Sequence, residues 1–272
     1  MTSPALAFAV AEAGAVGMLT PAPTAAMLEE QLQSVPDGSV VGVNFLVPFL
    51  DRDALAVAAE HAPLVEFFWG EPSAATVASV HAGGALASWQ VGGVDEARAA
   101  VDAGCDVVVA QGIEAGGHVR GTLPLLELIP EVRSAVGVPV VGAGGVGTAR
   151  AAADALAAGA DAVRAGTRFL AAAESNAHPV YIDALIAAGA DDTVLTTAFS
   201  EFWADAPHRV LRSCVEAGER LGAQQSWNPQ WPRASDPAPI ASRPLYAGTS
   251  VDGVRARQSA AEIVAELMSE YR

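Results

Sequence analysis

Short apolar runs alternate with amphipathic, alanine-rich segments over most of this chain. Apolar runs that are bounded by turn residues are typical of strands buried on both faces. They predict strands at residues 15–19, 40–45, 64–69, 85–90, 107–111, 139–143 and 162–166. The segments between them have helical spacing and predict helices at residues 4–13, 24–32, 51–61, 73–81, 94–103, 125–136 and 148–158.

A weak internal repeat supports this order of elements. The tripeptides Gly104-Cys105-Asp106, Gly159-Ala160-Asp161 and Gly189-Ala190-Asp191 each follow an alanine-rich segment. Glycine adopts the left-handed conformation after a helix at little cost, and the chain then turns into the next element. Strand, helix and glycine in this rhythm predict parallel βα units and an α/β fold.

Composition narrows the class of protein. With 272 residues, 51% of them hydrophobic, the chain can bury the core of one large α/β domain. The formal net charge of −16 argues against partners such as nucleic acid or an anionic membrane, because both need clustered Lys and Arg. Acidity on this scale favours solubility.

The cysteines and the N-terminus indicate the compartment. Cys105 and Cys214 lack metal-ligand spacing, so we expect two buried apolar residues, with no disulfide framework and no metal. The N-terminus has no basic leader, and no stretch approaches the ~20 apolar residues that span a bilayer. We therefore expect a soluble cytoplasmic protein.

The most informative stretch is the strand that ends at Gln111 and the glycine-rich loop that follows it to His118. Polar groups at the C-terminal ends of buried parallel strands are where α/β enzymes keep their chemistry. The Gln111 amide both donates and accepts hydrogen bonds. Gly116 and Gly117 remove two Cβ atoms beside His118, which lets a flat ligand lie against the backbone. Taken alone, Gly-Gly-His equally fits a simple turn with a solvated histidine.

Glycines also follow the next two predicted strands. Gly144 and Gly145 end the strand at 139–143, and Gly166 and Thr167 end the one after it. Two backbone-rich loops of this kind, with a helix N-terminus beside them, can surround one anion such as a phosphate. The alternative is that these glycines merely connect strands to helices.

Together these motifs resemble the signature of a known family. The string Gln111-Gly112-Ile113-Glu114-Ala115-Gly116-Gly117-His118 is similar to that of the nitronate monooxygenases, formerly called 2-nitropropane dioxygenases, which are FMN-dependent TIM barrels. The resemblance continues through residues 139–146, 166–169 and 174–175 and covers most of the chain.

The resemblance implies a TIM-type (β/α)8 barrel with a small helical subdomain. We expect the barrel in residues 1–172, a closing segment at 245–272, and the subdomain with its Pro- and Trp-rich loop at 173–244. Further helices are expected at 174–188, 206–221 and 256–271. Only seven strands are predicted, whereas this barrel has eight. The family's first strand has no match, so we expect either a start codon assigned too late or a shortened member.

The resemblance also assigns a flavin site. Asn44 would contact the flavin, although a strand-end asparagine can also cap a turn. Gln111 would bind the edge of the isoalloxazine, and Gly116 and Gly117 would line it. The residues expected at the FMN phosphate are Gly144, Gly145, Gly166 and Thr167.

His118 is the candidate catalytic residue. By resemblance, the substrate is an alkyl nitronate, which O2 oxidises to a carbonyl compound and nitrite. The imidazole can hold the nitro group, or it can act as a base toward a neutral nitroalkane, since an ordinary histidine has a pKa near 6.5. The expected partners are this small molecule and O2, and homo-oligomerisation stays open.

Two alternatives remain at this point. An FMN-dependent enoyl-thioester reductase of the enoyl-ACP type has a similar Glu-Ala-Gly-Gly-His loop. A truncated, catalytically weak flavin-binding or purely structural barrel would follow from the absent strand.

Several polar and aromatic residues have less certain roles. Arg164 lies inside a strand and needs a partner that the sequence does not supply. Arg168 fits either the phosphate or a surface carboxylate, and the carboxylate is favoured. Ser88 and Gln90 face the barrel mouth without a distinct role. We expect Trp227 and Trp231 to pack as a lid, and the remaining histidines to lie at the surface: His61, His81, His178 and His208.

Overall fold

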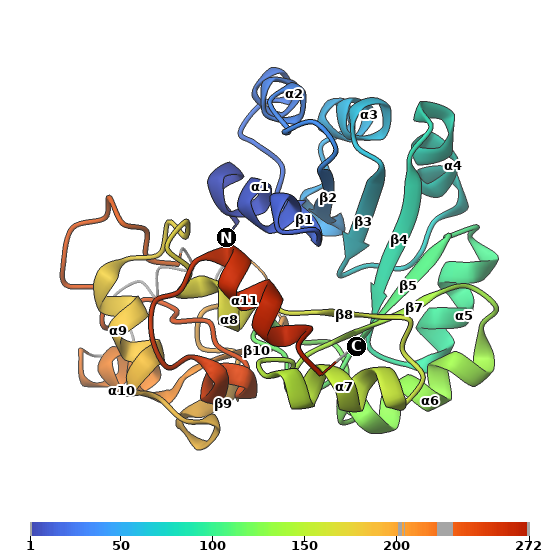
Figure 1. The fold of residues 1–272 in the computed structure, drawn as a ribbon. Helices are drawn as coiled ribbons and strands as arrows, with labels where there is room; N and C mark the ends of the chain where they lie inside the picture. Colours follow the sequence, from blue (N-terminus) through green and yellow to red (C-terminus); the bar gives the residue numbers. More distant parts are fainter. Residues whose placement is uncertain (1, 201–202, 204, 222–230, 271–272) are drawn as a thin grey trace.

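A computed structural model describes residues 2–200, 203, 205–221 and 231–270 of the chain (Figure 1). Seven parallel strands form one curled sheet in the order β1-β2-β3-β4-β5-β7-β8. The strands are β1 (Val16–Leu19), β2 (Val40–Leu46), β3 (Leu64–Phe68), β4 (Leu86–Val91), β5 (Val107–Gln111), β7 (Val140–Ala143) and β8 (Ala162–Arg164). Each corresponds to a strand predicted from the apolar runs, which confirms the α/β fold.

The helices that follow the strands cover the outer face of the sheet, and one further helix precedes β1 (Figure 1). They are α1 (Pro4–Glu12), α2 (Ala25–Gln33), α3 (Arg52–His61), α4 (Ala74–Gly83), α5 (Val94–Asp102), α6 (Leu125–Ala135) and α7 (Ala149–Ala157). Side-chain oxygens of Ser3, Thr24, Asp51, Ser73 and Thr148 accept from backbone N–H groups at the helix starts. Each such cap contributes about 1 kcal/mol, so local sequence sets where these helices begin.

The sheet remains open between β1 and β8, its two edge strands. The expected barrel without its first strand is therefore a seven-stranded half-barrel. Helix α1 lies at the opening (Figure 1). A Cβ on Gly17 of β1 would overlap the backbone carbonyl of Ala7, and Leu6 packs with Ile263 and other residues of α11 (Ala260–Leu267). Close packing of α1 against β1 therefore requires glycine at position 17.

The two faces of the sheet differ in polarity, because successive residues of a strand point to opposite faces. Val43, Phe67 and Trp89 belong to the apolar core between sheet and helices. The opposite, inner face carries polar side chains, and strand register places Glu66 directly between Asn44 and Ser88. The interior of the half-barrel is thus suited to polar contacts.

The second part of the chain packs around its own apolar core, which includes Tyr181, Ile182 and Cys214. It is not purely helical. Its elements are α8 (Thr167–Leu170), α9 (Pro179–Ala187), η2 (Ala190–Asp192), β9 (Thr193–Thr196), β10 (His208–Leu211), α10 (Arg212–Arg220) and η3 (Thr249–Gly253). Strand β10 lies between β9 and the short β6 (Gly117–His118) in an antiparallel sheet. Another short element, η1 (Val47–Phe49), follows β2.

Three helix predictions need correction in this region. The helix expected at 206–221 begins only at Arg212, because residues 208–211 pair with β9 and β6. Pairing with neighbouring strands overrides local helical spacing here. The helices expected at 174–188 and 256–271 begin later, at Pro179 and Ala260, and Tyr271 lies outside the described residues. None of the helices in the described ranges is long and apolar enough to span a bilayer.

Candidate active site

His118 lies in a cluster of rings. Its ring centroid is 4.1 Å from that of Trp203, 5.4 Å from His208, 5.6 Å from Trp69 and 6.0 Å from Tyr246. We call these five residues the aromatic cluster. Trp69 directly follows β3, His118 lies in β6 and His208 in β10, so the half-barrel and the second core both contribute. The His118 imidazole thus packs among other rings and is partly buried, whereas the alternative interpretation expected a solvated side chain.

Burial and a neighbouring histidine keep His118 neutral. Burial, and secondly the charge of neighbouring His208, lower the pKa of His118 to about 3. Burial also lowers the pKa of His208, although a backbone hydrogen bond to Ala206 acts in the opposite direction. Near pH 7 one ring nitrogen of His118 therefore carries a proton and the other has a free lone pair. This imidazole can donate a hydrogen bond, but it is a weak base.

Gln111 holds the His118 loop in place. Its Nε2 donates to the carbonyl oxygen of His118 over 2.9 Å, and its Oε1 accepts from the backbone N–H of Arg120 over 3.2 Å. The side chain thus bonds the loop on both sides of Val119. An amide group has a second donor and a second acceptor position, so the expected contact with a ligand edge remains a prediction.

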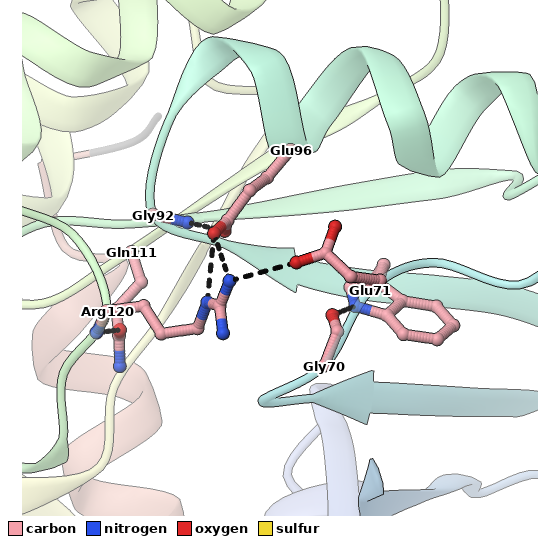
Figure 2. Close-up of polar contacts among 7 residues, drawn as sticks. Gly70, Glu71, Gly92, Glu96, Gln111 and Arg120 are labelled. Carbon is pink, nitrogen blue, oxygen red and sulfur yellow. Dashed lines mark hydrogen bonds and ion pairs between the residues drawn. The ribbon is translucent and has the colours of Figure 1, made fainter. Parts of the chain in front are cut away.

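Arg120 fixes the same loop to the outer part of the half-barrel (Figure 2). Its guanidinium donates to Glu96 through Nε over 2.9 Å and also through Nη2, and it lies 3.6 Å from the carboxylate of Glu71. Glu96 in turn accepts from the backbone N–H of Gly92 over 2.8 Å. Arg120 was not predicted as a site residue, because its one signal in the sequence is a cation two residues after His118.

Trp69 was also missed, and its backbone is unusual. Its φ of 65° lies in the left-handed region, which is strained for a bulky residue. Such strain is typically retained at functional positions. The indole contacts Trp203 at 4.9 Å between centroids and lies 5.6 Å from the guanidinium carbon of Arg120. The strained residue thereby links the aromatic cluster to the Arg120 ion pairs.

The glycine loops meet beside the His118 loop. Gly144 and Gly145 have φ values of 101° and 73°. A Cβ on Gly144 would lie 3.0 Å from the Gly112 carbonyl oxygen, and one on Gly145 would lie 3.3 Å from Cβ of Glu114. The loops after β5 and β7 are therefore packed closely against each other at the C-terminal edge of the sheet.

The residues after β8 contact the loops after β5 and β7 through the segment that precedes η3. The Thr167 hydroxyl accepts from the N–H of Gly248 over 2.9 Å, and a Cβ on Gly116 would overlap that same nitrogen. A Cβ on Gly166 would meet nothing within 4 Å, so space is open there. Close-packed glycine backbone beside open space can accommodate an anionic group, and binding of the FMN phosphate by these residues remains a prediction.

Asn44 lies inside β2, which continues to Leu46, so it does not cap a turn there. Its Nδ2 donates to Glu66 over 2.6 Å, and Glu66 also forms an ion pair with Arg164. Arg164 donates to Gln90 over 3.1 Å as well. The unknown partners of Arg164 are thus Glu66 and Gln90, both on the inner face of the half-barrel.

Of the two interpretations of Arg168, the carboxylate is confirmed. Arg168 contacts Glu266 at 2.6 Å and Gln258 at 2.5 Å. The expectation that the other histidines are surface residues is wrong for His208, which is fully buried, and for His178. His208 is buried because the misassigned segment around it is the central strand of a sheet.

The remaining expectations concern cysteines and tryptophans. Cys105 and Cys214 are free and buried, as predicted. Trp231 packs against the second core and under the guanidinium of Arg233, at 5.8 Å. Trp227 lies outside the described residues. The rings next to His118 come from Trp69 and Trp203, which the lid hypothesis did not include.

Comparison with known proteins shows the family to which this chain belongs. A family model described as Nitronate monooxygenase matches residues 39–270. A probable nitronate monooxygenase of Staphylococcus aureus is 38% identical over 148 residues, covering 51% of this chain and 41% of that protein. A putative monooxygenase of Mycobacterium tuberculosis is 31% identical over 238 residues, covering 87% of this chain and 58% of that protein. The chain therefore matches less than two thirds of the length of these relatives.

Solved structures agree with the fold. FabK from Thermotoga maritima superposes with a TM-score of 0.84 at 29% identity, over 99% of this chain and 88% of that one. Nitroalkane oxidase from Streptomyces ansochromogenes superposes with a TM-score of 0.80 at 28% identity, over 98% and 91% of the two chains. The half-barrel thus resembles these TIM-barrel structures along almost its whole length.

Proposed function

Because this chain belongs to the nitronate monooxygenase family, we propose that it binds FMN and oxidises alkyl nitronates with O2 to a carbonyl compound and nitrite. The observation that carries the proposal is the meeting of three loops at one edge of the sheet. The loop of His118, the glycines after β7 and Thr167 after β8 are all brought together there.

The residues available for FMN divide into two groups. Gly144, Gly145, Gly166 and Thr167 would hold the phosphate through backbone and hydroxyl groups. Gln111, Gly116 and Gly117 would line the isoalloxazine, and Asn44 would reach it from the inner face. When bound, the flavin would supply the redox chemistry that no side chain of the site offers.

His118 would orient the substrate. A neutral imidazole that donates one N–H suits a nitronate oxygen, which is a negatively charged acceptor. A bound anion next to the ring would raise the pKa of His118 from its low value and strengthen this hydrogen bond. A nitronate has already lost its α-proton, so no base is required for it. Only a neutral nitroalkane would need His118 to accept a proton.

The aromatic cluster would exclude water and contact the alkyl part of the substrate. Its rings surround His118 at centroid separations of 4.1 to 6.0 Å. Apolar walls with a few convergent polar groups are typical of small-molecule sites. We therefore propose small alkyl nitronates, rather than highly charged molecules, as the substrate class.

The test is a comparison of three reactions with the protein loaded with FMN. We expect O2 uptake and nitrite release with ethylnitronate, and slower turnover with nitroethane. NAD(P)H oxidation with a crotonyl thioester and no nitrite release would instead support the enoyl-thioester reductase alternative. Protein that takes up no FMN would support the weak or structural barrel.

A further inference from the structure

A charged cluster lies on the inner face of the half-barrel and shares no residue with the aromatic cluster. It consists of the Glu66–Arg164 ion pair with Asn44 and Gln90, and its members come from β2, β3, β4 and β8. Glu66 is 3% exposed, whereas the Arg164 side chain keeps 31% of its surface accessible. Both contacts of the guanidinium use Nη1, so its other nitrogens have donors to offer.

Strand register places Arg164 next to the proposed flavin site. Ala143 pairs with Gln111 on one side and with Arg164 on the other. These three residues form one row on the inner face, in which the small Ala143 separates two hydrogen-bonding side chains. Gly166, at the proposed phosphate loop, follows only two residues after Arg164. Arg164 therefore shares a row with Gln111 of the proposed ring site and precedes the proposed phosphate loop by two residues.

Stability alone does not account for this cluster. The desolvation cost of a buried ion pair often cancels its attraction, so that apolar residues of similar size would stabilise the fold equally well. Ser88, the register neighbour of Glu66, is 1% exposed, and its Oγ has no hydrogen-bond partner within the described residues. An unpaired buried hydroxyl is costly unless a ligand completes its hydrogen bonding. Both features point to a polar ligand.

We propose that Glu66 and Arg164, with their opposite charges, bind the polar part of the flavin and set its reduction potential. This proposal rests on the proposed function. The ribityl chain and the pyrimidine edge of a flavin offer both donors and acceptors, which match the guanidinium, the carboxylate and the Ser88 hydroxyl. Two-electron reduction adds negative charge to the flavin, so Arg164 favours the reduced form and Glu66 opposes it.

The experiment uses the full chain and three variants: Arg164→Gln, Glu66→Gln and the double variant. The control is Arg133→Gln, which removes a guanidinium from the ion pair with Asp161 on the outer surface, at 3.1 Å. FMN affinity is measured by fluorescence titration, and the potential of the bound flavin by equilibration with a reference dye. Circular dichroism checks the folding of each variant.

We expect Arg164→Gln to weaken binding of reduced FMN at least tenfold more than binding of oxidised FMN, which lowers the two-electron potential by at least about 30 mV. Glu66→Gln should raise the potential, the double variant should return toward the original value, and Arg133→Gln should leave it unchanged. If Arg164→Gln does not fold, the Glu66→Gln variant tests the proposal by itself. A raised flavin potential supports the proposal, and a lowered or unchanged potential contradicts it.

Two failures are distinguishable. If the original protein binds no FMN, the proposed function itself is wrong. If it binds FMN and the Glu66 and Arg164 variants leave its potential unchanged, the flavin assignment stands and the tuning role is refuted.

Discussion

The imidazoles of His118 and His208 face each other across the β6–β10 ladder, with ring centroids 5.4 Å apart. Nδ1 of His208 lies 3.0 Å from the carbonyl oxygen of Ala206, so this nitrogen carries the proton of the neutral ring. Nε2 of His208 is buried without a hydrogen-bond partner among the described residues. Two neighbouring imidazoles in such surroundings cannot both accept a proton at low cost.

Acid should therefore destabilise the fold through this pair. Both histidines have lowered pKa values in the folded state, about 3 for His118, whereas an unfolded histidine titrates near 6.5. Their contribution to stability is complete above pH 6.5 and is lost as the pH falls toward the folded pKa. Each histidine adds a slope of up to about 1.4 kcal/mol per pH unit in that window. Urea unfolding at pH 7 and pH 5 measures it.

Histidine variants distinguish the contribution of this pair to acid sensitivity from that of other titratable groups. His118→Gln and His208→Gln should each flatten the decline between pH 7 and pH 5. The matched control is His61→Gln, a surface histidine 3.8 Å from Glu29, and it should retain the original decline. Equal pH dependence in all four proteins would contradict a neutral buried pair.

Substitution of His118 should separate the two substrate types. His118→Ala should reduce turnover of nitroethane by about 10²-fold or more, because that substrate must lose a proton, and the anion that forms beside the ring raises the pKa of His118 from its low value. Turnover of preformed ethylnitronate should fall much less, by the loss of one hydrogen bond. Initial rates with both substrates at saturating O2 measure this. An equal loss on both substrates would refute the base role.

The Arg120–Glu96 pair should contribute measurable coupling energy. Its side chains are 23% and 28% exposed and form two hydrogen bonds, so a double-mutant cycle with Arg120→Gln and Glu96→Gln should give about 1 kcal/mol or more. The exposed Arg98–Asp95 pair, 3.5 Å apart, is the control and should give about 0.5 kcal/mol or less. Indistinguishable coupling energies would mean that Arg120 does not fix the His118 loop.

Gly145→Ala should impair both folding and ligand binding. A side chain at φ 73° is strained, and the new Cβ would lie 3.3 Å from Cβ of Glu114. We expect a loss of about 1 kcal/mol or more in the free energy of unfolding, together with weaker FMN binding. The control Gly137→Ala introduces a Cβ with nothing within 4 Å and should change neither. Unchanged FMN affinity in Gly145→Ala would argue against a phosphate at this loop.

The sequence was informative where local pattern determines structure. Each strand of the half-barrel is a short apolar run with turn residues beside it, and helix starts such as Asp51 carry their own caps. The glycine loops were recognisable because a motif such as the one ending at His118 is contiguous in the chain. Such features depend on neighbours only a few residues away.

The missed features depend on distant partners. Glu66 and Arg164 are 98 residues apart in sequence, and neither position indicates the other until the strands are arranged around one interior. His208 looked like a residue of a surface helix, but pairing with β6 and β9 makes it a buried strand residue beside His118. Tertiary context overrode local propensity there.

We propose that the loops after β7 and β8 bind a phosphate while the His118 loop faces the attached ring. Parallel titrations of the full chain with FMN and with riboflavin, which lacks the phosphate, test it most directly. We expect a 1:1 complex with FMN and an affinity for riboflavin at least about tenfold weaker, since each 1.4 kcal/mol of phosphate contact is a factor of ten. Equal affinities for both, or no binding of either, would contradict it.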